Sequence, residues 1–258
     1  MFTSQQLTLI EKYRGINTEH YEADYIEDQY TSFLGQMVGF RADRFYWSVS
    51  YSQGDGACFE GSEYETTQML MWVLLPDYRV WWKALIESGL GKDYYPRRPQ
   101  YWANDAIRRY TEKMGFQGEI IRQQYDRYYD QFLEVLGDNI KAFMAIGFEL
   151  EEVRLTVGHG SSHYYHSNTV HFDWSWPDSV DVLGNSDLEE DDVRYLALDA
   201  RAIDFEVDVR WVTEQVEDYL RSVMDDFYDD LEYLDSDEAV WDTIVANELD
   251  DELEEDVA

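Results

Sequence analysis

Residues 44–64, RFYWSVSYSQGDGACFEGSEY, predict a β-hairpin, and this hairpin decides the fold class. The first part, Arg44–Tyr51, is rich in aromatic and other β-forming residues, as strands are. Ser52–Gly56 predicts the turn, because two glycines around an aspartate relieve the steric cost of positive φ. Ala57–Tyr64 is then expected to return as the partner strand.

A second hairpin is expected over residues 152–176. Apolar residues alternate with polar ones on both sides of a glycine-containing turn at 158–162. These apolar positions are Val153, Leu155 and Val157 before the turn, and Val170, Phe172, Trp174 and Trp176 after it. The two hairpins, near 44–65 and 152–176, either stand apart or form one antiparallel sheet.

Helices are expected around the hairpins, which makes the fold class α+β. Apolar and aromatic side chains recur at helical spacing in residues 4–14, 19–38 and 103–145, with Gly137 as a stop in the last of these. In the apolar stretch 67–89, Pro76 is expected to end or kink a helix. Residues 89–100 predict a loop and 183–192 an acidic loop. Residues 194–212 fit either a strand or a helix.

The C-terminal part of the chain predicts an acidic amphipathic helix over Thr213–Leu234, with Thr213 as its N-cap. Apolar residues keep three-to-four spacing along one face: Val216, Leu220, Val223, Phe227, Leu231 and Leu234. The opposite face carries seven carboxylates: Glu214, Glu217, Asp218, Asp225, Asp226, Asp229 and Asp230. Ser236 is expected to cap a second helix, because acidic residues follow it where the helix dipole favours them.

These patterns predict two regions with different charge. Residues 1–180 form a mixed α+β core with 26 acidic and 16 basic residues, and residues 181–258 form a mainly helical region packed on it with 29 acidic and 4 basic residues. The net charges of −10 and −25 make up the total of −35. A field of this sign repels nucleic acids and anionic membranes, so a basic protein partner is expected.

The same composition predicts a folded protein of a reducing cytoplasm. Aromatic residues make up 16% of the chain, whereas disordered acidic proteins are poor in them. No run of eighteen apolar residues exists, and the N-terminus has no basic-then-apolar signal pattern, so neither a membrane span nor export is expected. The single cysteine, Cys58, has no partner for an internal disulfide.

One candidate site is a ligand cleft between the two hairpins, built from Gln53, Asp55, Cys58, His163 and His166. It would hold a small ligand or a metal, or act as an enzyme with Cys58 as nucleophile and a histidine as base. Four histidines fall within 159–171, but their spacing fits no zinc motif, so no metal and no cofactor are predicted.

The other candidate site is the row of carboxylates on the Thr213–Leu234 helix. Like charges at spacings of three and four destabilise an isolated helix, and only Arg221 interrupts the row. A solvated surface is the simplest interpretation. Such a row also imitates the phosphate spacing of a nucleic acid, which favours docking into a basic groove through steered, salt-sensitive binding.

Three motifs resemble a family of uncharacterised bacteriophage and prophage proteins, sometimes labelled antitoxin-like. They are the core SQGDGACFEG within 45–61, HYYHSNTVHFDW at 163–174 and YLDSDEAVWDTIVANE at 233–248. The resemblance covers about a fifth of the chain. It departs from the family after ANE, where this chain continues with the acidic LDDELEEDVA. The resemblance implies a phage-encoded protein in the cytoplasm of a bacterial host, without implying an activity.

Together, these observations predict a non-enzymatic acidic protein. Its expected role is to bind a basic, nucleic-acid-binding host protein, such as a nuclease or a restriction, CRISPR or RNA-degradation factor, and to inhibit it by nucleic-acid mimicry. A homodimer would double the charged surface. The ligand cleft is the alternative function.

Overall fold

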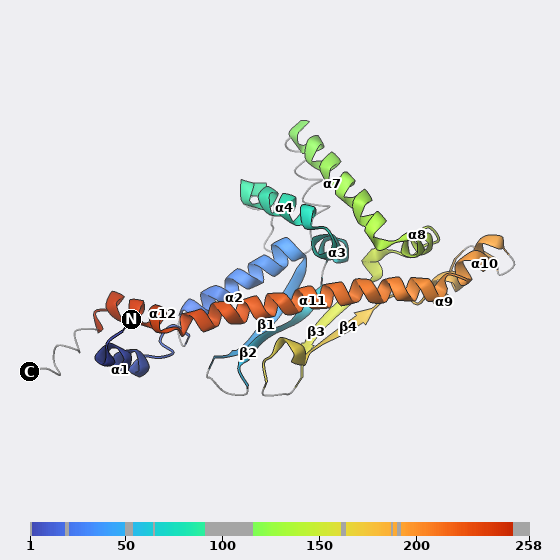
Figure 1. Ribbon diagram of the computed structural model, residues 1–258. Helices are drawn as coiled ribbons and strands as arrows, with labels where there is room; N and C mark the ends of the chain where they lie inside the picture. The colour runs from blue at the N-terminus through green and yellow to red at the C-terminus, as the bar shows by residue number, and fades with distance from the viewer. Residues whose placement is uncertain are drawn as a thin grey trace, which may run out of the picture.

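A four-stranded antiparallel sheet forms the centre of the computed structural model (Figure 1). Its strands lie in the order β1 (Phe40–Ser48), β2 (Gly56–Glu63), β3 (Arg154–His159) and β4 (Val170–Ser175). The α+β fold is therefore confirmed, and the two hairpins form one sheet. The structure describes residues 2–18, 21–49, 54–63, 65–90, 116–160, 164–186, 188–189 and 192–249.

The pairing of β1 with β2 depends on a glycine. The register shifts between Ala42 and Arg44, so β1 has a bulge opposite the end of β2. Gly61 lies directly across from Ala42, and a Cβ atom at Gly61 would lie only 2.0 Å from the carbonyl oxygen of Arg41. The close approach of the two backbones there requires a residue without a side chain.

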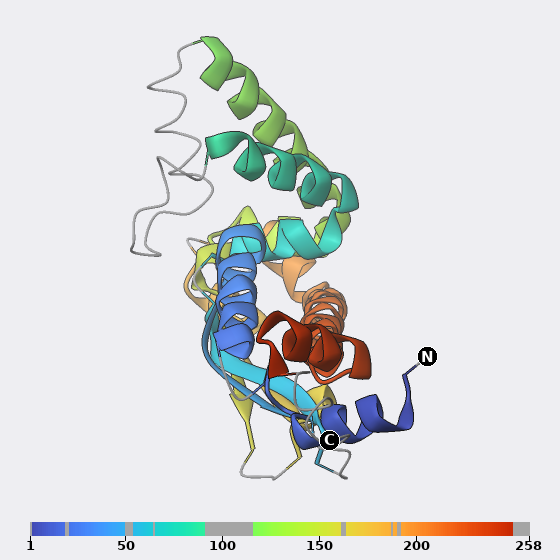
Figure 2. The ribbon, with the colours of Figure 1, turned by 90° about the vertical axis from the view of Figure 1, so that its left-hand side faces the viewer.

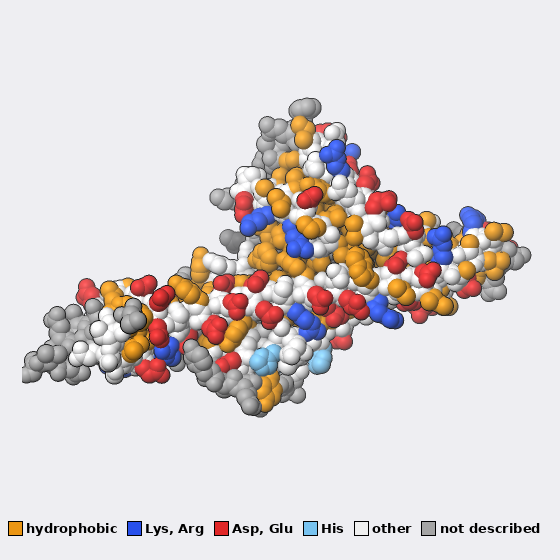
Figure 3. Space-filling model, viewed as in Figure 1, with side chains coloured by type: hydrophobic (Ala, Val, Ile, Leu, Met, Phe, Trp, Pro, Cys, Tyr) orange, Lys and Arg blue, Asp and Glu red, His pale blue; other side chains and the backbone are white. Residues whose placement is uncertain are grey.

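Helices α11 (Ala202–Leu234) and α2 (Tyr21–Phe33) lie side by side over the sheet (Figures 1 and 2). The apolar face predicted for α11 is confirmed, since Val216, Leu220, Val223, Phe227 and Leu231 are buried. The ring of Phe227 packs between two others, with centroids 5.1 Å from Tyr30 on α2 and 4.9 Å from Phe45 on β1. The opposite side of α11 faces outward (Figure 3).

The structure corrects the predicted start of this helix. Thr213 lies inside α11, where its hydroxyl donates to the carbonyl oxygen of Arg210, so it is not an N-cap. Residues 194–212 are helical, in α10 (Val193–Asp199) and the first third of α11. The strand-like alternation was misleading because Val207 and Trp211 are apolar but exposed, and only Phe205 and Val209, four residues apart, are buried.

A second group of helices stands beyond α2 and α11 (Figure 2). It contains α3 (Thr66–Leu74), α4 (Pro76–Leu85), α7 (Phe116–Leu136) and α8 (Asp138–Met144). Pro76 ends α3 as predicted and begins α4, where its missing N–H costs nothing. Gly137 separates α7 from α8, as predicted.

Short elements complete the described chain. Residues Leu34–Val38 and Ile86–Leu90 continue α2 and α4 as π-helical turns, and Leu150–Glu152 and Ser167–Thr169 form 3₁₀ turns. Part of the predicted acidic loop at 183–192 belongs to α9 (Ser179–Gly184), which Asp178 caps. Of the loop predicted at 89–100, residues 91–100 lie outside the described residues. No helix in the described ranges combines the length and the apolar character needed to cross a bilayer.

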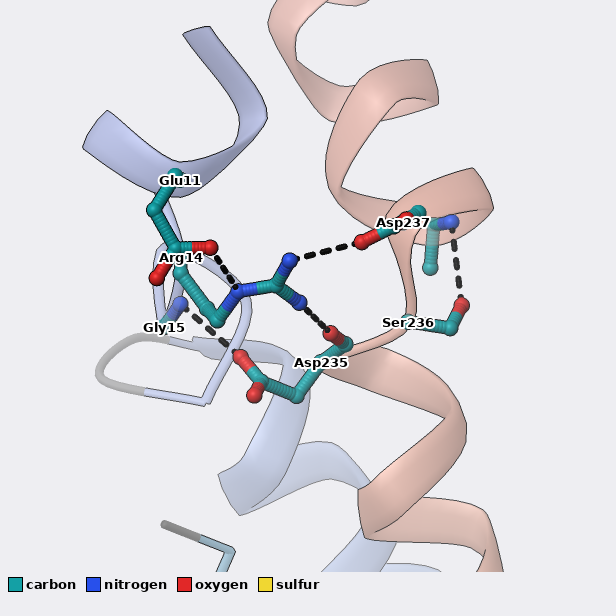
Figure 4. Close-up of polar contacts among 7 residues, drawn as sticks. Glu11, Arg14, Gly15, Asp235, Ser236 and Asp237 are labelled. Atoms are coloured by element: carbon teal, nitrogen blue, oxygen red, sulfur yellow. Dashed lines mark hydrogen bonds and ion pairs between the residues drawn. The ribbon is translucent and has the colours of Figure 1, made fainter. Parts of the chain in front are cut away.

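Arg14 joins the two ends of the described chain (Figure 4). It follows α1 (Ser4–Lys12) and donates to the carbonyl oxygen of Asp235 at 2.8 Å and to the carboxylate of Asp237 at 2.6 Å. The backbone N–H of Gly15 donates to the side chain of Asp235. These bonds hold α1 against α12 (Asp237–Ala246), which Ser236 caps as predicted.

Candidate functional site

The acidic helix α11 is the most highly charged element of the described structure. Its 33 residues span about 50 Å at about 1.5 Å per residue. It carries eleven carboxylates and two arginines, a net charge of −9. Figure 3 shows acidic side chains along its outward side, with hydrophobic side chains gathered where the second group of helices meets it.

The structure divides the seven predicted carboxylates into three groups. Four of them, Glu214, Asp218, Asp225 and Asp229, are exposed and lie opposite the buried face. Their spacings of four, seven and four residues place them in one line along the helix. We call these four residues the outward row. Asp226 and Asp230 are exposed as well, but they lie on the side of α11 that is nearer α2.

Glu217 turns toward the sheet instead. Its carboxylate accepts a hydrogen bond from the indole N–H of Trp174 at 3.2 Å, and Arg221 lies 3.9 Å from it. Partial burial raises the pKa of Glu217, although the hydrogen bond from Trp174 and the charge of Arg221 oppose this. Glu217 therefore connects α11 to β4.

Asp226 and Asp230 turn toward α2. The hydroxyl of Tyr30 donates to Asp230 at 2.8 Å, which links the two helices. Burial raises the pKa of Asp226, and the neighbouring carboxylates of Asp229, Asp230 and Asp225 raise it further. Asp230 therefore contributes to the contact between the two helices, while both carboxylates remain exposed to solvent.

The raised pKa values of three carboxyl groups predict that these groups stabilise the protein more at about pH 4 than at about pH 7. For Glu217, Asp226 and Asp235, burial is the largest cause of a raised pKa. The native state therefore binds protons more tightly than the unfolded state, and the stability gained below the ordinary carboxyl pKa is lost as the pH rises through the raised values. Thermal unfolding at a series of pH values measures this dependence.

The variant Asp226→Asn supplies the control for this pH dependence. It removes one of the titrating groups from α11, so its unfolding temperature should vary less with pH than that of the unaltered protein. An unfolding temperature that varies with pH as much in Asp226→Asn as in the unaltered protein would contradict the prediction.

A cleft of about 880 Å³ lies beside the outward row. Its lining residues come from the turn before β2, from the segment before β4 and from α11: Asp55, Tyr164, His166, Asn168, Asp225 and Tyr228, together with Gly56, Ala57 and Ser167. The structure thus brings Asp55 and His166 together, as the ligand-cleft alternative expects. It also adds Asp225, which the sequence assigned only to the acidic helix.

Of the other residues predicted for the ligand cleft, only Cys58 belongs to the described part of the chain, and it does not line the cleft. Gln53 and His163 lie outside the described residues. Cys58 is completely buried in β2, and burial raises the pKa of its thiol to about 12. A nucleophilic cysteine needs the opposite shift, so this environment does not suit Cys58 for covalent catalysis.

Close backbone contacts hold the cleft in shape. The N–H of Tyr165 donates to the carbonyl oxygen of Gly54, and a Cβ atom at Gly56 would lie 2.7 Å from the carbonyl oxygen of Tyr165. On the other wall, Arg221 donates to the carbonyl oxygen of Ser167 and lies over the ring of Phe172 at 4.6 Å. Arg221 thereby ties the segment before β4 to α11.

The histidines do not form a metal site within the described ranges, where no group of three or more His, Cys, Asp or Glu side chains could hold an ion. A ring nitrogen of His159 lies 3.0 Å from the carbonyl oxygen of Tyr164, and the ring stacks on Tyr46. His171 is exposed on β4. His166 alone of these three lines the cleft.

Sequence reasoning missed the roles of Arg221 and Tyr228. Tyr228 follows Asp225 by three residues, which places both on neighbouring parts of one helix surface, so this spacing was the available signal. Nothing in the sequence indicated that Arg221 would reach Ser167, 54 positions away.

No family model, curated protein or solved structure matches this chain.

Proposed function

We propose that this protein docks the outward row of α11 on a basic, nucleic-acid-binding protein and inhibits it by occupying the groove that normally holds nucleic acid. The single observation that carries the proposal is the line of exposed carboxylates on one rigid helix with a net charge of −9. In the setting that the motif resemblance implies, the protein is phage-encoded and its partner is a protein of the bacterial host.

The charge density of α11 supports mimicry of a single strand rather than of a duplex. The outward row carries four charges over about 22 Å, or about one charge per 7.5 Å. One strand of DNA carries a charge about every 3.4 Å along the axis, and a duplex about every 1.7 Å. The spacing between charges in the outward row is therefore about twice the spacing along one strand of DNA.

Packing on the sheet keeps this surface in place before binding. The buried face of α11 and the bonds from Trp174 and Tyr30 fix the orientation of the helix. A preorganised acidic surface loses little conformational entropy on association. Because the outward row is exposed, its attraction to a basic groove acts at long range and is screened by salt.

Affinity capture from bacterial lysate, followed by mass spectrometry, tests the proposal. We expect one nucleic-acid-binding protein to be retained at about 0.05 M salt and released at about 0.5 M, because the Debye length falls severalfold over this range. Added single-stranded nucleic acid should compete for the same partner. Capture of no specific protein at either salt concentration would contradict the proposal.

Small-molecule binding in the cleft is a second candidate function. It is favoured by the convergence of Asp55, His166 and Asp225 from three segments that lie far apart in the sequence. Native mass spectrometry of the purified protein would show a co-purified ligand as added mass. A protein that carries such a ligand and captures no partner would favour this function over mimicry.

A further inference from the structure

We infer that the cleft beside Asp225 binds a guanidinium group, the side chain of an arginine that the basic partner presents. The inference rests on the proposed function, and it names the chemistry by which one part of the acidic surface recognises that partner.

Two carboxylates from separate parts of the chain line the cleft. Asp55 belongs to the turn before β2, and Asp225 belongs to the outward row of α11. A guanidinium group has five N–H donors in one plane, so it can donate to more than one carboxylate at once. Ser167 and Asn168 line the same cleft, and their side chains carry oxygens that can accept from such donors.

Aromatic rings form other parts of the lining. Tyr164, 45% exposed, and Tyr228 contribute from opposite segments, and His166 stacks on Tyr164 with ring centroids 6.2 Å apart. Arginine stacks on aromatic faces through its flat cation better than lysine does. The protein uses this contact itself, since Arg221 lies over Phe172 at 4.6 Å and Arg79 over Tyr219 at 4.8 Å.

The other ligand classes fit this cleft less well. A phosphate or carboxylate ligand would meet the charges of Asp55 and Asp225 and a protein net charge of −35. A metal ion would need three grouped ligands, which the described residues do not supply. A flat organic cation satisfies both the carboxylates and the rings.

Contacts within the protein fix both sides of the cleft in the absence of a ligand. The contact of Gly56 with Tyr165 fixes one side, and the bond from Arg221 to Ser167 fixes the other. Preorganisation of this kind improves affinity because fewer side chains must be ordered on binding. A volume of about 880 Å³ leaves room for an arginine side chain together with part of the backbone that carries it.

Titration with Nα-acetylarginine amide, followed by NMR at about 0.15 M salt, tests the inference directly. We expect saturable binding of one molecule, with the largest shifts at residues that line the cleft. The lysine amide should bind more weakly, and the uncharged citrulline amide should not bind. Asp225→Asn and Asp55→Asn should each lower the affinity for the arginine amide about tenfold, the usual effect of losing a charge-assisted hydrogen bond.

Asp204→Asn is the matched control, because it removes the same charge from an exposed position of α11 outside both the cleft and the outward row. It should leave the affinity within about twofold, as expected of an exposed charge at a distance. Equal weakening by Asp204→Asn, or binding that does not saturate, would show general attraction to an acidic protein and overturn the inference. Circular dichroism of each variant checks that the fold is retained.

These outcomes separate the inference from the proposed function. If the arginine amide does not bind but partner capture still depends on the outward row, the cleft inference alone is wrong. If the amide binds as expected but no partner is captured, the cleft is a cation site and the mimicry proposal is wrong.

Discussion

Reversing the outward row, by Glu214→Lys, Asp218→Lys, Asp225→Lys and Asp229→Lys together, is expected to weaken binding to the captured basic partner about a thousandfold. An exposed ion pair contributes about 0.2–1 kcal/mol, and each reversal also replaces an attraction with a repulsion of similar size. Four reversals then cost about 4 kcal/mol, and about 1.4 kcal/mol corresponds to a factor of ten in affinity. Calorimetric titration of the purified pair at low salt measures the loss.

The control for this experiment changes the charge of the protein by the same amount elsewhere. Asp77, Glu87, Asp126 and Asp130 are exposed on the second group of helices, in α4, the π-helical turn after it and α7. Reversing these four also changes the net charge from −35 to −27. We expect this control to lose less than about tenfold in affinity. If both variants lose affinity equally, total charge rather than the outward row determines binding.

Gly61→Ala is expected to destabilise the protein by about 3 kcal/mol, the upper end of the usual cost of overpacking a well-packed site. The added methyl group would lie 2.0 Å from the carbonyl oxygen of Arg41 and 2.9 Å from the Cα atom of Ala42. Both are backbone atoms of β1, so a change of side-chain rotamer cannot relieve the clash. The strands must separate at the bulge, next to the buried rings of Phe40 and Phe59.

Gly158→Ala provides a matched comparison in the same sheet. A Cβ atom at Gly158, in β3, would meet nothing within 4 Å. Its effect on the free energy of unfolding should stay within about 0.5 kcal/mol, as for other substitutions without a clash. Urea denaturation of the two variants measures the difference. Equal stabilities would mean that β1 and β2 do not approach as closely as described.

The sheet could be predicted from the sequence because its signals are local. Alternation at Leu155 and Val157, and the glycines of the first turn, act within a few residues. The bulge at Ala42 could not be predicted, because it depends on which residue of β2 lies opposite. The start of α11 was missed for a different reason. Phe205 and Val209 are four residues apart, and over so short a stretch this spacing fits both the period of a helix and the period of a strand.

The candidate site could be predicted only in part for the same physical reason. The carboxylates of α11 were predicted from their periodicity. The sequence did not show which of them would contact other elements, because Trp174 lies 43 positions from Glu217 and Tyr30 lies 200 positions from Asp230. Asp55 and His166 were expected to meet if the hairpins paired. The contribution of Asp225 to that cleft depends on where α11 crosses the sheet, which no local pattern encodes.

The contact between α1 and α12 gives this molecule two cooperative units of unequal size. A small core, separate from the large one between the sheet and its helices, is formed by Leu9, Ile10, Val240 and Ile244. The hydrogen bond from Arg14 to Asp237 stabilises it. A core of this size opens at a smaller free energy than the whole domain. We therefore expect the amide hydrogens of α12 to exchange through local openings that leave the sheet intact, and those in the middle of α11 to exchange only when the whole domain unfolds.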